Sequence, residues 1–120
     1  MRAALSAAPN GADADLARAL RVLRKRVMLR LIARDLGGIA ALSEVLSTIT
    51  TLAEVAVGHA LDVLDERLAA QHGRPLDASG RTQQLHVLGM GKLGGGELNV
   101  SSDVDLVFAY PEEGDRKSVV

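Results

Sequence analysis

The stretch that most constrains this chain spans residues 85–110 and reads LHVLGMGKLGGGELNVSSDVDLVFAY. It starts as a short apolar run, breaks into a glycine-rich loop, and resumes as an alternating segment that contains Asp103 and Asp105. Like charges two residues apart on one face of a strand repel each other unless a cation lies between them. We therefore expect a functional site here. We expect the apolar positions of the second segment to be buried, namely Val104, Leu106 and Phe108.

The composition fits one small domain with a largely helical core. Of 120 residues, 48% are apolar and 2% aromatic, which favours packed helices over stacked sheets. The 14 basic and 15 acidic side chains nearly balance, which argues against a dedicated nucleic-acid partner. There is no cysteine, no apolar run of the signal-peptide kind and none of membrane-spanning length, so we expect a cytoplasmic protein without a membrane partner.

A first long helix is predicted upstream of this stretch. Residues 1–12 show no helical period and are expected to form a disordered lead-in. The helix should begin at Asp13 or Asp15, whose side chains suit a first turn, and should stop at Gly37 and Gly38. Its apolar face follows the 3-and-4 spacing of a helix and comprises Leu16, Leu20, Leu23, Val27 and Leu31.

A second helix should begin near Ser43, whose hydroxyl can cap the first amides, and should run to about His72. Its predicted apolar face comprises Val45, Ile49, Leu52, Ala56, Ala60 and Val63. A short glycine joint between two long amphipathic helices predicts an antiparallel hairpin over residues 13–74. The polar, turn-rich residues 75–84 are expected to form a linker.

The first helix carries a basic cluster at residues 21–30, RVLRKRVMLR. Its bases are spread around the helix and alternate with Leu and Val. This pattern is typical of a solvated face, or of one that meets an acidic partner, more than of a nucleic-acid surface.

Two familiar phosphate-binding loops do not fit the glycine-rich stretch. A P-loop needs a glycine five residues before its Gly-Lys pair and a hydroxyl after it, where this chain has His86 and Leu93. A dinucleotide fingerprint is present as Gly89, Gly91 and Gly94. However, only roughly nine residues precede the next strand, too few for the helical crossover between parallel strands that this alternative requires.

A third pattern fits better: a strand, a loop of small residues, and a strand carrying Asp-x-Asp. Glycine amides can approach phosphate oxygens closely, and Lys92 can neutralise their charge. Asp103 and Asp105 should project from one face of the second strand with Cα atoms roughly 7 Å apart. Mg²⁺ suits two such oxygen ligands and keeps positions for water and phosphate. The competing interpretation is a plain hairpin with a glycine turn and two solvent-facing acids.

The run GMGKLGGGELNVSSDVDLVFAYPEEG, with LRKRVMLRLIARDLGG and LAEVAVGHAL upstream, closely resembles the bifunctional glutamine synthetase adenylyltransferase/adenylyl-removing enzymes. These belong to the nucleotidyltransferase (DNA polymerase β-like) superfamily. The resemblance extends over about residues 16–114. It implies a mixed α+β chain, in which the long helical hairpin precedes the start of a truncated nucleotidyltransferase domain at residues 85–114, with its first two strands and glycine loop.

The resemblance also implies roles for individual residues. Asp103 and Asp105 occupy the positions of catalytic, metal-binding acids, while Gly91 and Lys92 replace the superfamily's Gly-Ser pair. The superfamily's third acid has no counterpart in these 120 residues, so we expect little or no turnover. The expected nucleotide-binding set is Gly91, Lys92, Gly94, Gly95 and Ser102, of which the serine can bond a phosphate or merely shape the turn.

Members of this family attach AMP from ATP to a tyrosine of glutamine synthetase and remove it by phosphorolysis, under control of a PII-type nitrogen signalling protein. The resemblance thus implies Mg²⁺ as cofactor, ATP or ADP as nucleotide, and these two proteins as partners. Met90, Gly96 and Asn99 match the removing domain more closely, but the sequence leaves the half-reaction open. The alternative function is a non-catalytic helical interaction module that docks on one of these proteins.

Residues 115–120, DRKSVV, leave the family pattern. They equal a translation of a common sequencing-adapter read, so we expect a non-native tail. Resequencing the locus tests this expectation.

Overall fold

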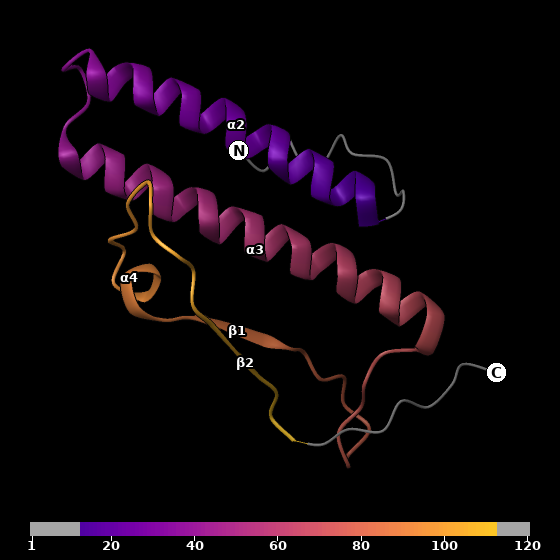
Figure 1. Cartoon of the computed structure of the whole chain (residues 1–120). Helices are drawn as coiled ribbons and strands as arrows, with labels where there is room; N and C mark the ends of the chain where they lie inside the picture. The colour runs from indigo at the N-terminus through magenta and orange to yellow at the C-terminus, as the bar shows by residue number, and fades with distance from the viewer. Residues whose placement is uncertain (1–12, 113–120) are drawn as a thin grey trace.

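The computed structural model describes residues 13–112, so the predicted lead-in at 1–12 and tail at 115–120 lie outside the described residues. Figure 1 shows α3 between α2 on one side and a strand layer with the short α4 on the other. The predicted mixed α+β architecture is confirmed. The elements in chain order are α2 (Asp13–Leu36), α3 (Leu42–His72), β1 (His86–Gly89), α4 (Gly91–Gly94) and β2 (Leu106–Ala109).

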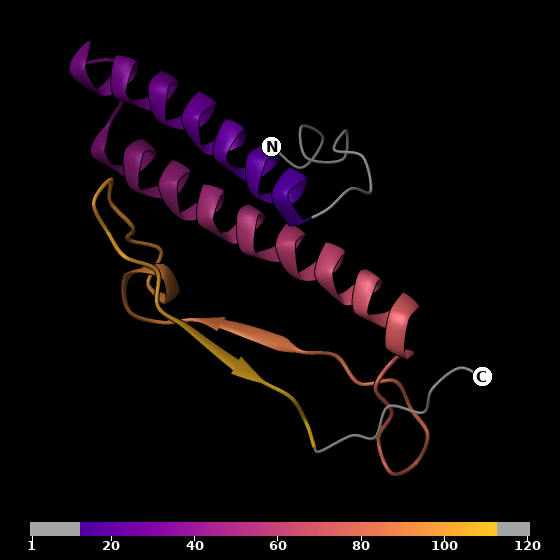
Figure 2. The ribbon, with the colours of Figure 1, turned by 45° about the vertical axis from the view of Figure 1, so that its right-hand side comes forward.

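The two long helices form the antiparallel hairpin that the glycine joint predicts. α2 ends at Leu36, where the Gly37 amide donates a 3.1 Å hydrogen bond to the carbonyl of Ala33. Gly38 then adopts a φ of 66°, a left-handed value that glycine reaches without steric penalty. The chain reverses there, and α3 runs back alongside α2 (Figure 2).

Ion pairs join both ends of the hairpin. At the turn, Arg34 donates from Nε to Glu44 Oε1 at 2.8 Å and from Nη2 to Oε2 at 3.1 Å. This hydrogen bonding raises the pKa of the Arg34 guanidinium and lowers the pKa of the Glu44 carboxyl. At the open end, Arg67 of α3 lies 2.7 Å from Asp13 at the start of α2. The two pairs together fit a single antiparallel register.

α3 begins one residue before the predicted start, and the predicted cap is wrong. The N-cap is Ala41, which makes no side-chain hydrogen bond, so Ser43 lies inside the first turn. The predicted end is correct, because the helix stops at His72 and Gly73 adopts a φ of 76°. Packing of the apolar face, rather than a capping hydroxyl, therefore accounts for where α3 starts.

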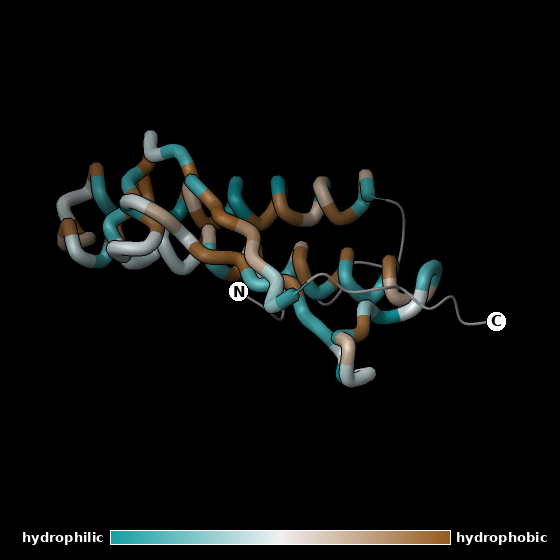
Figure 3. The backbone as a smooth tube through the Cα atoms, turned by 90° about the horizontal axis from the view of Figure 1, so that it is seen from below, coloured by the Kyte–Doolittle hydropathy of each residue, from teal (hydrophilic) through white to brown (hydrophobic). Residues whose placement is uncertain are grey.

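The helical faces predicted from the sequence are buried where the helices pack on each other. Hydrophobic residues recur along both helices in Figure 3. The second half of α3 is less covered, since its predicted positions Ala56, Ala60 and Val63 are only half-buried. Within the described residues, no helix combines the length and apolarity needed to cross a membrane. The buried members of the predicted faces are Leu16, Leu23, Leu31, Val45, Ile49 and Leu52.

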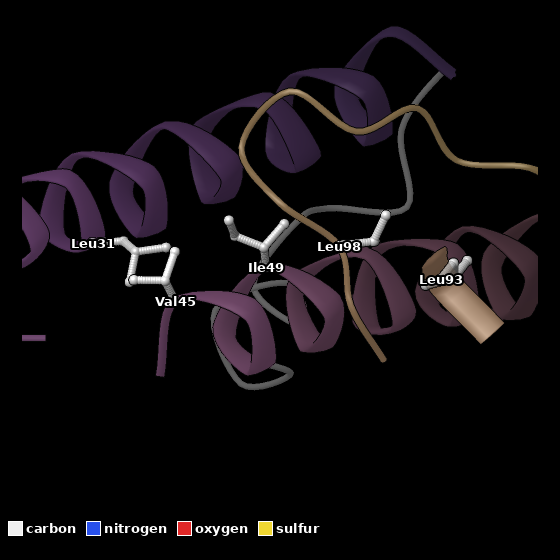
Figure 4. Close-up of a cluster of buried hydrophobic side chains, with 5 residues drawn as sticks. All are labelled: Leu31, Val45, Ile49, Leu93 and Leu98. Carbon is white, nitrogen blue, oxygen red and sulfur yellow. The ribbon is translucent and has the colours of Figure 1, made fainter. Parts of the chain in front are cut away.

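One buried cluster joins the hairpin to the glycine loop. Leu31 and Val45 point toward each other from the two helices, and Ile49 lies one turn further along α3 (Figure 4). Leu93 and Leu98 enter the same cluster from the loop, and Leu98 is only 1% exposed. The loop therefore shares the core of the hairpin. Burying a leucine side chain contributes roughly 1.5–3 kcal/mol to the free energy of folding.

β1 and β2 form a two-stranded antiparallel ribbon in which Val87 lies opposite Phe108 and Gly89 opposite Leu106. The dinucleotide-binding alternative requires parallel strands joined through a helix, and this pairing contradicts it. The segment between the strands contains only the single helical turn α4.

The predicted burial of the second strand is largely wrong. Leu106 is half-buried, but Val104 is 42% exposed and Phe108 61% exposed. The reason is that the ribbon does not pack closely on α3, and an open groove of about 750 Å³ lies between them. Phe108 lines this groove together with Val87 and Leu106 and stays largely exposed.

Candidate functional site

The glycine loop connects the two strands and is fixed to α3. After β1, Met90 precedes the single turn of α4, and the loop then returns to β2. Leu93 and Leu98 anchor it in the core, 7% and 1% exposed. In addition, the Leu98 amide donates a 3.2 Å hydrogen bond to the hydroxyl of Thr50 in α3. This role of Thr50 has no signal in the sequence, because one threonine on an amphipathic helix has no distinctive spacing.

Most backbone amides of the loop bond to the loop itself. The amides of residues 93–97 donate to nearby carbonyl oxygens at 2.8 to 3.2 Å. In the described part of the chain, the amides of Gly91 and Lys92 have no such acceptor. Of the predicted phosphate-binding positions, these two thus offer free backbone donors, while the amides of Gly94 and Gly95 are already used. The acceptors of the loop amides are the carbonyls of Met90, Gly91, Lys92 and Leu93.

Gly91 and Gly94 are required by the backbone path. Gly91 has a φ of 53°, in the left-handed region that favours glycine. A Cβ on Gly94 would lie 2.6 Å from the carbonyl oxygen of Gly89, closer than packed atoms can come. Gly94 therefore lets α4 lie against the end of β1. Gly95 has an ordinary φ of −80°, and a Cβ there would meet nothing closer than 3.5 Å.

Asp103 and Asp105 lie in the segment before β2, not within the strand as predicted. β2 begins at Leu106, and the Met90 amide extends the pairing by one residue through a 2.9 Å hydrogen bond to the carbonyl of Asp105. Pairing stops there because β1 turns into α4 and offers no further partner. Both acids are exposed, and Asp105 Oδ2 lies 3.8 Å from the position that a Cβ on Gly91 would occupy. The structure thus brings the Asp105 carboxylate to the start of the glycine turn.

The serines before the acids shape a turn around Asn99. Ser102 Oγ donates a hydrogen bond to Asn99 Oδ1 at 2.8 Å and accepts one from the Asn99 backbone amide at 3.1 Å. Ser101 donates to the same Oδ1 from its amide at 3.1 Å and from its hydroxyl at 3.2 Å. Of the two roles expected for Ser102, these contacts correspond to shaping the turn. Asn99 was not singled out for this role, although an asparagine two and three residues before serines is a signal for such a turn.

The carboxylate oxygens of Asp103 and Asp105 are the type of ligand that a hard divalent cation prefers. Mg²⁺ is commonly held by one or two carboxylates, with water and phosphate oxygens completing the octahedron. Asp103 and Asp105 supply two carboxylates of that type. Across residues 13–112, no group of three or more His, Cys, Asp or Glu side chains comes together.

Two open cavities lie between α3 and the strand layer. The smaller, of about 330 Å³, is lined by Glu54 of α3 and by Leu93 and Gly94 of the loop. The larger, an apolar groove of about 750 Å³, continues along the second half of α3 beside the ribbon. Asp103 and Asp105 line neither cavity. The acid pair and these apolar cavities are therefore separate features.

Comparison with known proteins identifies the family. The family model of glutamate-ammonia ligase adenylyltransferase matches residues 1–120. The chain belongs to this family. It is similar to proteins named bifunctional glutamine synthetase adenylyltransferase/adenylyl-removing enzyme, with 54% identity over 113 residues in Nitrosomonas europaea and 60% over 101 residues in Chromobacterium violaceum. These alignments cover 89% and 83% of this chain.

The same alignments cover only 12% and 11% of the two relatives, so the chain spans a small part of their length. Membership of the adenylyltransferase family confirms the resemblance inferred from the glycine loop and its acids. The roles of Gly91, Lys92, Asp103 and Asp105 stay predictions, because a family match does not test individual residues.

Proposed function

We propose that this chain is part of a nucleotidyltransferase that moves an adenylyl group between a nucleotide and glutamine synthetase. Family membership and the names of the similar proteins support this proposal. The observation that carries it is the position of the Asp105 carboxylate beside Gly91. At that point the Asp105 carboxylate meets a turn in which, among the described residues, the amides of Gly91 and Lys92 have no hydrogen-bond acceptor.

The loop side of the site would bind phosphate oxygens. The free amides of Gly91 and Lys92 are held in place by the turn, so they would need little reorganisation to donate to an anion. The Lys92 residue is exposed, and its ammonium would neutralise part of the phosphate charge. In this proposal Gly94 acts by keeping the turn compact, whereas the shape of the turn does not require a glycine at Gly95.

The acid side of the site would hold Mg²⁺ through Asp103 and Asp105. A bound Mg²⁺ would neutralise phosphate charge during transfer. Without a cation the Asp105 carboxylate would repel a nucleotide, because its negative charge lies beside the phosphate-binding turn. Nucleotide binding is therefore expected to depend on Mg²⁺.

Two directions of transfer are compatible with this site. In one, a tyrosine hydroxyl of glutamine synthetase displaces pyrophosphate from ATP. In the other, phosphate takes AMP from the modified tyrosine and forms ADP. We place this reaction in the cytoplasm, under control of a PII-type signalling protein. Because the 120 residues provide only the two acids of the predicted site, the isolated chain should show little turnover of its own.

Mg²⁺-dependent binding of ATP to the gene product that carries this chain tests the proposal. Asp103→Asn and Asp105→Asn should each weaken binding at least about tenfold, or roughly 1.4 kcal/mol. Asp62→Asn is the matched control, because Asp62 is an exposed acid on α3. Unchanged ATP binding and transfer activity in both site variants would instead favour the non-catalytic helical module.

A further inference from the structure

We propose that the outer face of α2 docks an acidic amphipathic helix of a partner protein. This inference goes beyond the proposed transfer reaction and does not rest on it. We call the surface the α2 stripe, and it consists of Arg18, Arg21, Lys25, Leu29, Ile32 and Leu36, all of them exposed.

The α2 stripe follows one line along the helix. Its members are three or four residues apart, which places them on a common face. The buried residues Leu16, Leu23 and Leu31 lie on the face that packs against α3. At ~1.5 Å per residue, the stripe is about 27 Å long, enough to seat five turns of another helix.

The first half of the α2 stripe is a row of uncompensated positive charge. Among the described residues, no carboxylate forms an ion pair with Arg18, Arg21 or Lys25. The acids of α2 are Asp13 and Asp15 in its first turn, the latter one turn before Arg18, and Asp35; none lies between Arg18 and Lys25. A partner that covers the row must therefore bring carboxylates of its own.

The second half of the α2 stripe is apolar. Leu29 is 60% exposed, Ile32 40% and Leu36 83%. Further along the chain, Ile39 in the hairpin turn and Leu42 at the start of α3 are also exposed, by 66% and 73%. Large aliphatic side chains exposed together on one helical face mark an interaction surface more often than a solvated one.

The order of charge and apolarity along the axis selects the class of partner. A nucleic-acid backbone would match the basic half but offers no apolar surface to Leu29 and Leu36. A membrane surface suits a helix whose apolar face runs its whole length, whereas here the apolar half follows the basic half. A helix with acidic residues over one half of a face and leucines over the other matches both halves at once.

Fluorescence anisotropy with labelled peptides tests this proposal on the full 120-residue chain. The probe is a designed helix of about 20 residues, with glutamates over the first half of one face and leucines over the second, in the antiparallel and the parallel order. The matched peptides carry lysine in place of glutamate. We expect one order of the acidic peptide to bind, with affinity that falls as salt rises, and the lysine peptides not to bind.

Paired charge reversals on α2 locate the binding surface. Arg18→Glu with Lys25→Glu should weaken binding more than about tenfold. Arg24→Glu with Arg26→Glu changes the net charge equally but lies about 80–120° around the helix, and should weaken binding less than about threefold. If the first pair unfolds the chain by circular dichroism, Arg18→Gln with Lys25→Gln replaces it and should still weaken binding about threefold or more.

Several outcomes would overturn the proposal. They include equal weakening by the two reversal pairs, binding of the lysine peptides, and tighter binding of an RNA oligonucleotide or of anionic phosphatidylserine vesicles than of either acidic peptide. Self-association of the chain that Leu29→Gln abolishes, without any peptide binding, would assign the stripe to a second copy instead.

Discussion

The backbone amide of Leu98 in the glycine loop donates a 3.2 Å hydrogen bond to the hydroxyl of Thr50 in α3, across 48 positions of sequence. Both residues are removed from water, with Thr50 6% exposed and Leu98 1% exposed. A buried amide that loses its acceptor cannot turn to solvent and carries its full desolvation cost. Besides the packing of Leu93 and Leu98, the hydroxyl of Thr50 therefore holds the glycine loop in position.

Replacing Thr50 with valine should lower the free energy of unfolding by about 1–3 kcal/mol, because the Leu98 amide is left buried without an acceptor. Thr50→Ser keeps the hydroxyl and loses only a methyl group, so it should be clearly more stable than Thr50→Val. Urea denaturation of the two variants measures the difference. Equal stability of the valine and serine variants would show that the hydrogen bond contributes nothing.

Two neighbouring glycines of the loop should respond differently to alanine. Gly94→Ala places a Cβ 2.6 Å from the backbone oxygen of Gly89, and relieving that contact should cost about 1–3 kcal/mol of stability. Gly95→Ala meets nothing closer than 3.5 Å and should stay within about 0.5 kcal/mol of the parent. Thermal denaturation of the pair checks this expectation, and a reversed order of stability would contradict the packing of α4 on β1.

The helical hairpin could be predicted because its signals are local. The apolar spacing through Leu16, Leu23 and Leu31 and the glycines at 37 and 38 each act within a few residues of chain. The start of α3 was placed only approximately, because the capping hydroxyl of Ser43 was overridden by packing around Val45.

The site was predictable in its residues but not in its geometry. Glycine loop and acid pair are visible in the sequence, yet the start of β2 after Asp105 depends on where β1 turns at Met90. The anchoring of Leu98 on Thr50 depends on residues 48 positions apart, and no periodic pattern encodes such a pair. The exposure of Phe108 likewise depends on the open groove between the ribbon and α3, which no local sequence pattern encodes.

Gly58 offers a stabilising substitution in the middle of α3. A Cβ added there meets no atom within 4 Å, and glycine is among the poorest residues in a helix interior. Gly58→Ala should therefore raise the free energy of unfolding by about 0.5–1 kcal/mol. Gly38→Ala is the contrasting control, because the φ of 66° there strains alanine and should lower stability. Thermal denaturation measures both, and a destabilised Gly58→Ala would contradict the open space seen beside α3.

Asp77 closes the turn between α3 and β1 with four hydrogen bonds to its carboxylate. The Ser79 hydroxyl donates at 2.6 Å and the Ser79 amide at 2.9 Å, while Arg81 donates from its amide at 2.8 Å and from Nε at 2.9 Å. The bonds from the Ser79 side chain and the Arg81 backbone are the main reasons that the pKa of Asp77 is lowered to about 2. Protonation of this carboxyl therefore weakens the hydrogen bonds that hold the turn.

The sign of the pH effect follows from this lowered pKa. An unfolded aspartate titrates at about 3.9, so the folded chain holds the Asp77 proton less tightly, and its contribution to stability is lost as pH falls from about 4 to about 2. Asp77→Asn keeps one acceptor oxygen but does not titrate, so its urea midpoint should fall less than that of the parent chain between about pH 4.5 and pH 2.5. Asp62→Asn, at an exposed acid of α3, should retain the parental pH dependence. Parallel pH profiles for Asp77→Asn and the parent would mean that the turn does not couple to the folded state.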